Sequence, residues 1–252
     1  MDFPVLDPRP GGPAERFAGR FDGAHPAKVF AAALILGFIL LAALSIAVGA
    51  LVTQVLIKID GVASADGSVV QSIVDERASS LTTLSEVGST VGSIVLVVVA
   101  VVVAIYFAYR RQWIVAAFAL FLPPVESGTY RLTSMVDARH RPDVHRLEDL
   151  PVDASYPSGH TAASIAVYAG LVLLFASQIK DPAMRRLAWA AAVLIVVFVA
   201  LSRIYRGMHH PLDAAGGVLV GIGAIAVVLF ACRCANAALD LRSSTSMKES
   251  DR

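Results

Sequence analysis

Three short segments carry histidine and arginine side chains at the edges of apolar runs. They are residues 139–142 (RHRP), 156–160 (YPSGH) and 202–213, which opens with Ser-Arg and ends on Asp. Ionisable residues at the boundary of an apolar helix are costly, so they are candidates for a functional site. Two imidazoles, two guanidinium groups and a carboxylate together supply a nucleophile, an acid and fixed positive charge, which suffices for phosphoryl transfer without a metal.

The second segment has the features of a helix start. Ser158 stands directly before an apolar run, where its hydroxyl can cap a helix. The amides of Gly159 and His160 would then point outwards with the positive end of the helix dipole, an arrangement that favours an anion. A plain helix cap followed by a solvated histidine explains the same residues without any ligand.

The third segment places an acid close to a histidine. Pro211 suits the first turn of a helix, which puts Asp213 in that turn and His209 just before it. The carboxylate can accept from one ring nitrogen of His209 and leave the other nitrogen unprotonated, as a nucleophile requires. Arg203 and Arg141 offer planar forks that match phosphate oxygens. Each part also has a plainer interpretation, in which Asp213 caps its helix and the arginines extend to the membrane interface.

The composition requires a membrane around these segments. Of 252 residues, 56% are hydrophobic and 16% are charged, and the mean hydropathy is +0.68. These values are too apolar for an ordinary soluble domain. The net charge of +1 argues against a nucleic-acid partner. Cys232 and Cys234 are too few for a disulfide framework or a structural zinc site, so no metal and no cofactor are expected.

Apolar runs long enough to cross a bilayer, about 20 residues each, can be counted in the sequence. Five are plain: Val29 to Ile57, Val91 to Tyr109, Ser158 to Ile179, Leu187 to Ile204 and Pro211 to Cys232. A sixth segment, Trp113 to Val136, is apolar for only its first half and contains Pro123 and Pro124. Basic loops belong on the cytoplasmic side, and the loops at 109–111 and 180–186 share a side only if this segment crosses.

The sequence therefore predicts an all-α, integral membrane six-transmembrane-helix bundle with short loops. Both termini are expected in the cytoplasm, and the three chemistry-bearing segments are expected at the outer face, where they form a pocket. The cost is that Glu126, Thr129 and Arg131 must face protein or water. Rich use of Ala, Val, Gly and Arg is compatible with a bacterial protein of high genomic GC content, and the expected location is the bacterial cytoplasmic membrane.

The predicted domain boundaries follow the same pattern. Residues 1–27 are rich in proline and glycine and are expected to form a disordered cytoplasmic lead. Residues 28–235 form the membrane domain, with a large outer loop at 58–90, and residues 236–252 form a cytoplasmic tail. In the last span, Gly217 and Gly221 form a small-x3-small pair that allows close helix packing.

The motifs resemble a known family. Arg141-Pro142, then Pro157-Ser158-Gly159-His160, then the spacing S-R-x5-H-x3-D from Ser202 to Asp213, are similar to the three-part signature of the type 2 phosphatidic acid phosphatase superfamily. The resemblance covers about Trp113 to Phe230. The membrane branch of this family has six helices with the site at the outer face.

One position departs from the family pattern. The first motif, K-x6-R-P, would place its lysine at position 134, where this chain has Ser134. Arg131 lies about one helical turn earlier, and we hypothesise that it reaches the same phosphate.

Carried over by position, the resemblance implies a separate catalytic or binding role for each residue of the motifs. His209 attacks phosphorus to give a phosphohistidine, Asp213 holds its tautomer, and His160 protonates the leaving oxygen and then activates water. Four groups would bind the phosphoryl oxygens: Arg141, Arg203, Ser158 and the Gly159 amide. The auxiliary candidates are Arg131, Arg139 and Tyr156.

The expected function is a metal-independent lipid phosphate phosphatase. Its partners would be the membrane and a lipid substrate, namely a polyprenyl diphosphate, phosphatidic acid or phosphatidylglycerol phosphate, and the sequence does not separate these. A lipid phosphotransferase would use the same site. A non-catalytic membrane scaffold or transporter is a third hypothesis, against which the intact set of His160, His209 and Asp213 argues. The oligomeric state stays open.

Overall fold

A computed structural model describes residues 3–21, 23–149 and 154–250. In this part of the chain the regular structure is helical, apart from one isolated bridge between His140 and Ala154, so the predicted all-α class is confirmed. The longer helices are α2 (Pro26–Gln54), α3 (Val62–Asp75), α4 (Ser79–Thr90), α5 (Leu96–Tyr109), α6 (Trp113–Val136), α9 (Pro182–Tyr205) and α10 (Pro211–Ser250). The shorter ones are η1 (Pro4–Leu6), α1 (Pro13–Ala18), η2 (Leu56–Lys58), η3 (Val91–Val95), α7 (Gly159–Ser164), η4 (Ile165–Ala169), α8 (Gly170–Phe175) and η5 (Ala176–Gln178).

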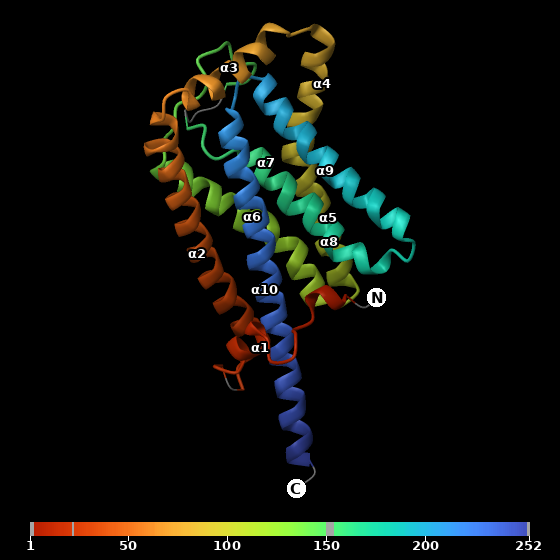
Figure 1. Ribbon diagram of the computed structural model, residues 1–252. Helices are drawn as coiled ribbons and strands as arrows, with labels where there is room; N and C mark the ends of the chain where they lie inside the picture. Colours follow the sequence, from red (N-terminus) through yellow and green to blue (C-terminus); the bar gives the residue numbers. More distant parts are fainter. Residues whose placement is uncertain (1–2, 22, 150–153, 251–252) are drawn as a thin grey trace.

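The long helices form an elongated bundle, with both ends of the chain at one end and α3 across the other (Figure 1). Five helical stretches of the described residues are long and apolar enough to cross a membrane: Pro26–Lys58, Ser79–Tyr109, Gly159–Gln178, Pro182–Tyr205 and Pro211–Ser243. They coincide with the five predicted spans. The second begins at Ser79, earlier than the predicted Val91, because α4 continues through the π-helical η3 into α5.

The doubtful sixth segment forms one continuous helix. α6 spans 24 residues, includes Pro123 and Pro124, and packs against α5, α10 and α2. Glu126 and Thr129 face the protein, with 1% and 0% of their surface exposed, whereas Arg131 is exposed. Glu126 and Thr129 therefore face protein, as the sequence requires.

Helix starts are set by local capping. The His25 side chain accepts a hydrogen bond from the Ala27 amide directly before α2, and the Asp181 carboxylate accepts from the Ala183 amide directly before α9. In both helices proline occupies the first position, where its missing N–H costs no hydrogen bond. Ser158 caps α7 in the same way, as predicted, by accepting from the Thr161 amide.

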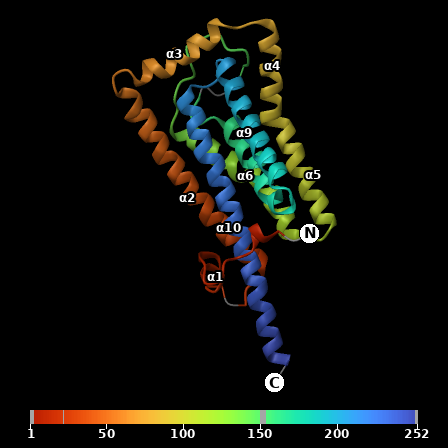
Figure 2. The same ribbon diagram turned by 45° about the vertical axis from the view of Figure 1, so that its right-hand side comes forward.

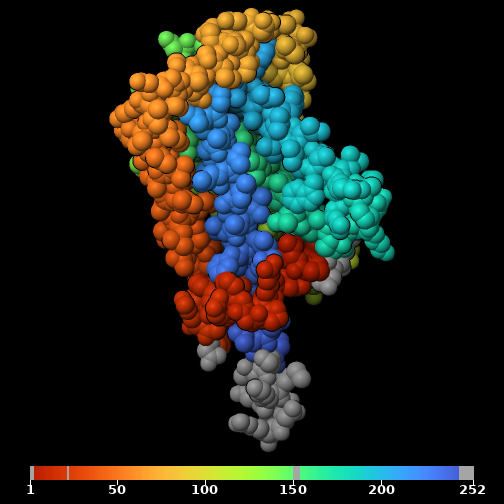
Figure 3. Space-filling view, in the orientation of Figure 1, coloured from red at the N-terminus to blue at the C-terminus, as the bar shows by residue number. Residues whose placement is uncertain are grey.

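The prediction of a disordered N-terminal lead is wrong for the described residues. Phe3 packs edge-on against Phe107 and Phe175, with ring centroids 5.4 and 5.8 Å apart, and Leu6 is 2% exposed. The Arg233 guanidinium of α10 donates to the Val5 carbonyl. Burial of these apolar side chains outweighs the proline and glycine content of the segment. Figure 3 shows the N-terminal residues lying across the base of the bundle. Residues 1, 2 and 22 of the predicted lead, and 251–252 of the predicted tail, lie outside the described residues.

The segment at 58–90 is a helical cover, where an outer loop was expected. α3 crosses the end of the bundle and α4 descends beside α9 (Figure 2). The segment is polar because α3 and α4 supply buried polar side chains, including Asp66, Ser85 and Ser89, to the residues beneath them. The predicted boundary of the loop is therefore wrong in its second half, which belongs to the bundle.

Close packing brings α10 against α7. A Cβ atom on Gly217 would lie 2.6 Å from the Ser158 carbonyl, and one on Gly221 would lie 2.6 Å from the Ala162 carbonyl. Only glycine fits at these two positions, so the small-x3-small pair serves packing as predicted. Cys232 and Cys234 are free thiols buried in the core.

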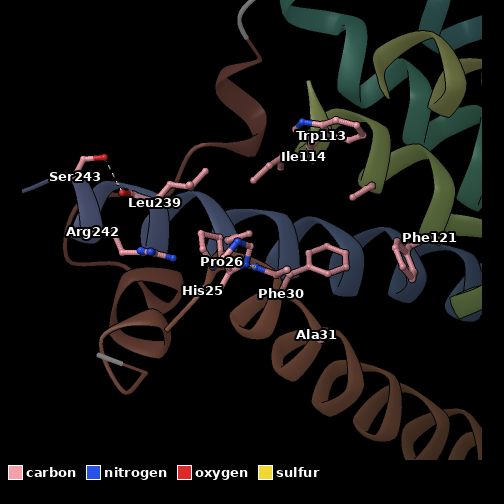
Figure 4. Close-up of a pocket in the computed structure, with 13 residues that line it drawn as sticks. His25, Pro26, Phe30, Ala31, Trp113, Ile114, Phe121, Leu239, Arg242 and Ser243 are labelled. Carbon is pink, nitrogen blue, oxygen red and sulfur yellow. Dashed lines mark hydrogen bonds between the residues drawn. The ribbon is translucent and has the colours of Figure 1, made fainter. Parts of the chain in front are cut away.

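A cavity of about 1260 Å³ lies near the chain termini, between the first turns of α2 and α6 and the far part of α10 (Figure 4). Phe30, Trp113 and Phe121 contribute to its apolar lining, and His25 and Arg242 are its two ionisable lining residues. The histidines and arginines predicted to do chemistry are absent from its lining, so the candidate site is elsewhere.

Candidate active site

A second cavity, of about 480 Å³, lies between α6, α7 and the η3 junction of α4 with α5. Five of the predicted site residues line it: Arg131, Arg141, Gly159, His160 and His209. The remaining lining residues are Gly92, Ser93, Ile94, Leu96, Val97, Pro123, Glu126, Ser127, Tyr130 and Ala163. Segments that are far apart in the sequence thus converge on one cavity, as expected from the motifs.

His209 is oriented by a backbone carbonyl. Its Nδ1 lies 2.7 Å from the Ser155 carbonyl oxygen, whereas Asp213 Oδ2 is 3.9 Å from that nitrogen. A carbonyl only accepts, so Nδ1 carries the proton and Nε2 keeps its lone pair. The structure therefore differs from the expectation that Asp213 holds the tautomer. Ser155 is itself held by the preceding motif, since its amide donates to the Arg139 carbonyl.

The surroundings of His209 keep its ring neutral. Burial lowers the pKa of His209 to about 3, and the positive charges of Arg203 and Arg141 also lower it, although the Asp213 carboxylate acts in the opposite direction. A neutral imidazole with a free Nε2 is the nucleophilic form of histidine.

This protonation state predicts a specific titration behaviour. Because the folded pKa lies far below the ordinary value of about 6.5, His209 should stay neutral, with its proton on Nδ1, from pH 8 down to pH 5. Nitrogen-15 spectra of histidine-labelled protein in micelles, assigned with a His209→Gln variant, would measure this. The same residue in denatured protein should titrate near about 6.5. A folded-state midpoint above about 5 would contradict the geometry.

Asp213 anchors its neighbours. It is fully buried, and its Oδ2 accepts from the His210 amide at 2.7 Å, while its Oδ1 accepts from Arg139 at 2.8 Å. Arg139 donates its other terminal nitrogen to Asp66 at 2.6 Å. Arg139 is absent from the cavity lining and ties α3 to the start of α10, so it positions the loop that carries His209.

Arg203 is held by a carboxylate that the sequence reading missed. Its Nη1 donates to both oxygens of Glu148 at 2.8 Å and to Ser89 Oγ at 2.5 Å. Arg206 donates its Nε to the same carboxylate at 2.5 Å. Burial alone would raise the pKa of Glu148, but the charge of Arg203 and hydrogen bonds from Arg203, Ser89 and Arg206 lower it to about 2.

The contacts of Arg203 and Arg206 with Glu148, here called the arginine clamp, leave part of the Arg203 guanidinium without a partner. The guanidinium is fully buried, and among the described residues its Nε and Nη2 atoms have no hydrogen-bond acceptor. A buried donor without an acceptor is costly, so these atoms lack a partner that an anion could supply, although Arg203 is not among the residues that line the cavity. Arg141 is 6% exposed, donates Nη1 to the Met208 carbonyl at 2.7 Å and lines the cavity.

Two further candidates, Ser158 and Tyr156, support the segments that line the cavity. Ser158 caps α7 from a fully buried position, and its amide donates to the Asp213 carbonyl. Tyr156 lies away from the cavity lining, where its ring packs so closely on Gly216 that a Cβ there would lie 2.5 Å away. Burial, together with the charge of Asp213, raises the pKa of Tyr156 to about 12.

The departure from the first motif has a simple structural account. Ser134 donates its hydroxyl to the Tyr130 carbonyl within α6 and does not line the cavity. Arg131 does line it, which leaves the hypothesis of a substitute cation open to test. Among the described residues, no group of three or more His, Cys, Asp and Glu side chains is placed to hold a metal ion.

Comparisons with known proteins point to the same family as the motifs. Residues 134–235 match the family model of the PAP2 superfamily. This part of the chain is similar to the PAP2 superfamily. The resemblance drawn from the motifs is thereby confirmed, and the match contains His160, His209, Arg141 and Arg203.

Two curated relatives extend the likeness. The chain is 31% identical over 108 residues, 43% of its length, to an undecaprenyl-diphosphatase of Sulfolobus acidocaldarius. It is 34% identical over 121 residues, 46% of its length, to a decaprenylphosphoryl-5-phosphoribose phosphatase of Mycobacterium tuberculosis. The matches span 48% and 60% of these relatives' own lengths.

A solved structure shares the fold over most of the chain. It is the crystal structure of a transmembrane PAP2 type phosphatidylglycerolphosphate phosphatase from Bacillus subtilis, with 25% identity and a TM-score of 0.62. The likeness covers 77% of this chain and 92% of that one. Together with the five apolar helices, it makes this chain an integral membrane protein.

Proposed function

We propose that this PAP2 protein is a membrane phosphatase that removes a phosphate group from a lipid by way of a phosphohistidine. The observation that carries the proposal is the joint placement of His160, His209 and Arg141 on one cavity, with the Nδ1 of His209 held by the Ser155 carbonyl. The PAP2 relatives, each a phosphatase by name, support the reaction class.

The reaction has two steps. In the first, Nε2 of His209 attacks phosphorus, the bond from phosphorus to the leaving oxygen breaks, and His160 gives that oxygen a proton. In the second, His160 takes a proton from water, the water oxygen attacks phosphorus, and the bond to Nε2 breaks to release inorganic phosphate. Both steps spread negative charge over the phosphoryl oxygens, and fixed positive groups stabilise that charge.

We assign that stabilisation to the side chains of Arg141 and Arg203, the Ser158 hydroxyl and the Gly159 amide, with Arg131 as an additional cation at the cavity. The unpartnered Nε and Nη2 atoms of Arg203 support its place in this set. Asp213 and Arg139 act by holding the His209 loop. No step requires a metal ion in this scheme.

A lipid substrate follows from where the cavity opens. Ile94 and Val97 line the cavity and are also 66% and 45% exposed on the outside of the bundle. An apolar chain can therefore stay in the bilayer beside these residues while its phosphate reaches His209. The candidate substrates are a polyprenyl diphosphate, phosphatidic acid and phosphatidylglycerol phosphate.

The proposed topology has six crossings, with both termini in the cytoplasm and the cavity near the outer face. α6 is 24 residues long, about 36 Å of helix, which is enough to cross with the other five. Its crossing places the basic segments at 109–111 and 180–186 on the same side.

The decisive experiment is phosphate release by purified protein in detergent from these lipid phosphates, with and without EDTA. We expect inorganic phosphate to accumulate equally in both conditions. Loss of activity with EDTA, restored by added metal, would contradict the metal-free mechanism. Accumulation of a phosphorylated acceptor in place of inorganic phosphate would show a phosphotransferase, and no turnover of any lipid would contradict the proposal.

A further inference from the structure

A buried carboxyl group shares the cavity with the two histidines. Glu126 is 1% exposed and lines the cavity from α6. Its Oε2 accepts a hydrogen bond from Ser127 Oγ at 3.0 Å, whereas its Oε1 has no partner among the described residues. The mechanism proposed above assigns no role to this group. A buried polar atom without a partner is costly enough to indicate that a bound ligand completes it.

The position of Glu126 along α6 indicates which part of a substrate it meets. Arg131, which lines the cavity too, lies five residues further on, so Glu126 is about 7.5 Å away along the helix axis. The nearby lining residues Pro123 and Ala163 are apolar. Glu126 and Ser127 are therefore a polar patch set apart along α6 from Arg131, where a part of the substrate other than the phosphate can lie.

The chemistry of a carboxyl group restricts what that part can be. Its oxygens accept hydrogen bonds from hydroxyl groups, and the Ser127 hydroxyl beside it can both donate and accept. A bare acyl or prenyl chain would leave Oε1 without a partner.

We propose that Glu126 and Ser127 bind a hydroxyl-bearing leaving group, such as the glycerol or sugar that joins the scissile phosphate to the lipid. This inference rests on the proposed phosphatase activity and narrows its substrate class to lipid phosphomonoesters in which a polyol follows the phosphate.

A matched pair of substrates tests the assignment. Phosphatidylglycerol phosphate and its analogue lacking the glycerol hydroxyl differ in one oxygen atom. We expect the wild-type protein to hydrolyse the hydroxyl-bearing lipid with a kcat/KM about tenfold higher or more, because a buried hydrogen bond to the substrate is lost in the analogue. We expect the ratio of kcat/KM for the two lipids to fall close to one in Glu126→Leu. In Glu126→Gln we expect a ratio between one and the wild-type value.

The control is Glu86→Gln, which neutralises an exposed glutamate of α4 and should keep the wild-type ratio. The wild-type ratio is measured without any variant, so the proposal can still be tested if Glu126→Leu fails to fold. A wild-type ratio near one, or a ratio that Glu126→Leu leaves unchanged, would overturn the role of Glu126 while the phosphatase proposal stands. Release of phosphate from a polyprenyl diphosphate but from neither of these lipids would overturn only the role of Glu126, whereas absence of release from every lipid phosphate tested would overturn both.

Discussion

Replacement of His209 by alanine is expected to lower the rate of phosphate release by about 10⁴-fold or more. The variant lacks the Nε2 atom that attacks phosphorus in the proposed mechanism, and in the described residues His160 is the other histidine on the cavity lining. Removal of a nucleophile costs far more than removal of one phosphate-binding arginine, since the remaining cations still stabilise the transition state.

The measurement is phosphate release from the best lipid substrate, combined with trapping of the enzyme-bound phosphate. Wild-type protein mixed with labelled substrate and quenched should carry label that is stable in base and lost in acid, as expected for a phosphohistidine, and His209→Ala should carry none. His145→Ala is the matched control, because that exposed histidine in the loop at 143–149 uses only its carbonyl, as an acceptor for Arg77. Turnover by His209→Ala within tenfold of the wild type would refute the assignment.

The residues to which we assign the chemistry could be proposed from the sequence because their types are restrictive. His160 and His209 are costly at the ends of apolar helices, which marks them as functional candidates, whereas their meeting on one cavity depends on the packing of the bundle. The spans could be predicted for a similar reason, since an apolar run of about 20 residues has few alternatives to a crossing helix.

The residues that hold the site together could not be predicted in the same way. The partner of His209 Nδ1 is the Ser155 carbonyl, and a backbone atom leaves no trace in residue type. Glu148 lies 55 residues from Arg203 in the sequence and is one of several acids in a polar loop. Its contact depends on the path of that loop, which no periodicity specifies. Asp213, which looked like the orienting acid, is occupied by the His210 amide and Arg139.

The segments at 3–21 and 58–90 show why composition misleads at the ends of a bundle. Proline and glycine between residues 4 and 13 indicated disorder, yet Phe3 and Leu6 bury enough apolar surface to dock the segment. In the second segment the useful signal was the spacing of Ser85 and Ser89, one helical turn apart and both buried against the arginine clamp. Glu126 was expected to face protein, which is correct, but its place in the cavity required the packed bundle.

Substitution of Glu148 by glutamine is expected to impair both the activity and the stability of the protein. The carboxylate is the counter-ion that Arg203 and Arg206 share, and the neutral amide keeps its volume but not its charge. Breaking a buried ion pair from one side leaves its partners uncompensated. With 23% of the Glu148 side chain exposed, we expect a loss of about 2 kcal/mol in the free energy of unfolding. We expect a fall of about 100-fold in kcat/KM, because Arg203 loses its fixed orientation.

The pKa of Glu148 also predicts how pH acts on this contribution. The folded pKa, about 2, lies below the ordinary value of 4.5, so the carboxylate stabilises the fold fully above about pH 4.5 and progressively less as the pH falls toward 2. Thermal unfolding of the wild type and Glu148→Gln in detergent should therefore differ at pH 7 and converge near pH 2. Asp149→Asn, at the exposed neighbouring position, is the control and should behave like the wild type at both pH values.

The kinetic measurement separates the positioning of Arg203 from stability alone. If Glu148 only stabilises the fold, Glu148→Gln assayed well below its unfolding temperature should keep the wild-type kcat/KM. If it positions Arg203 for the phosphate, kcat/KM should stay depressed at every temperature at which the protein is folded. Retention of full activity in folded Glu148→Gln would remove Arg203, or its clamp, from the phosphate site.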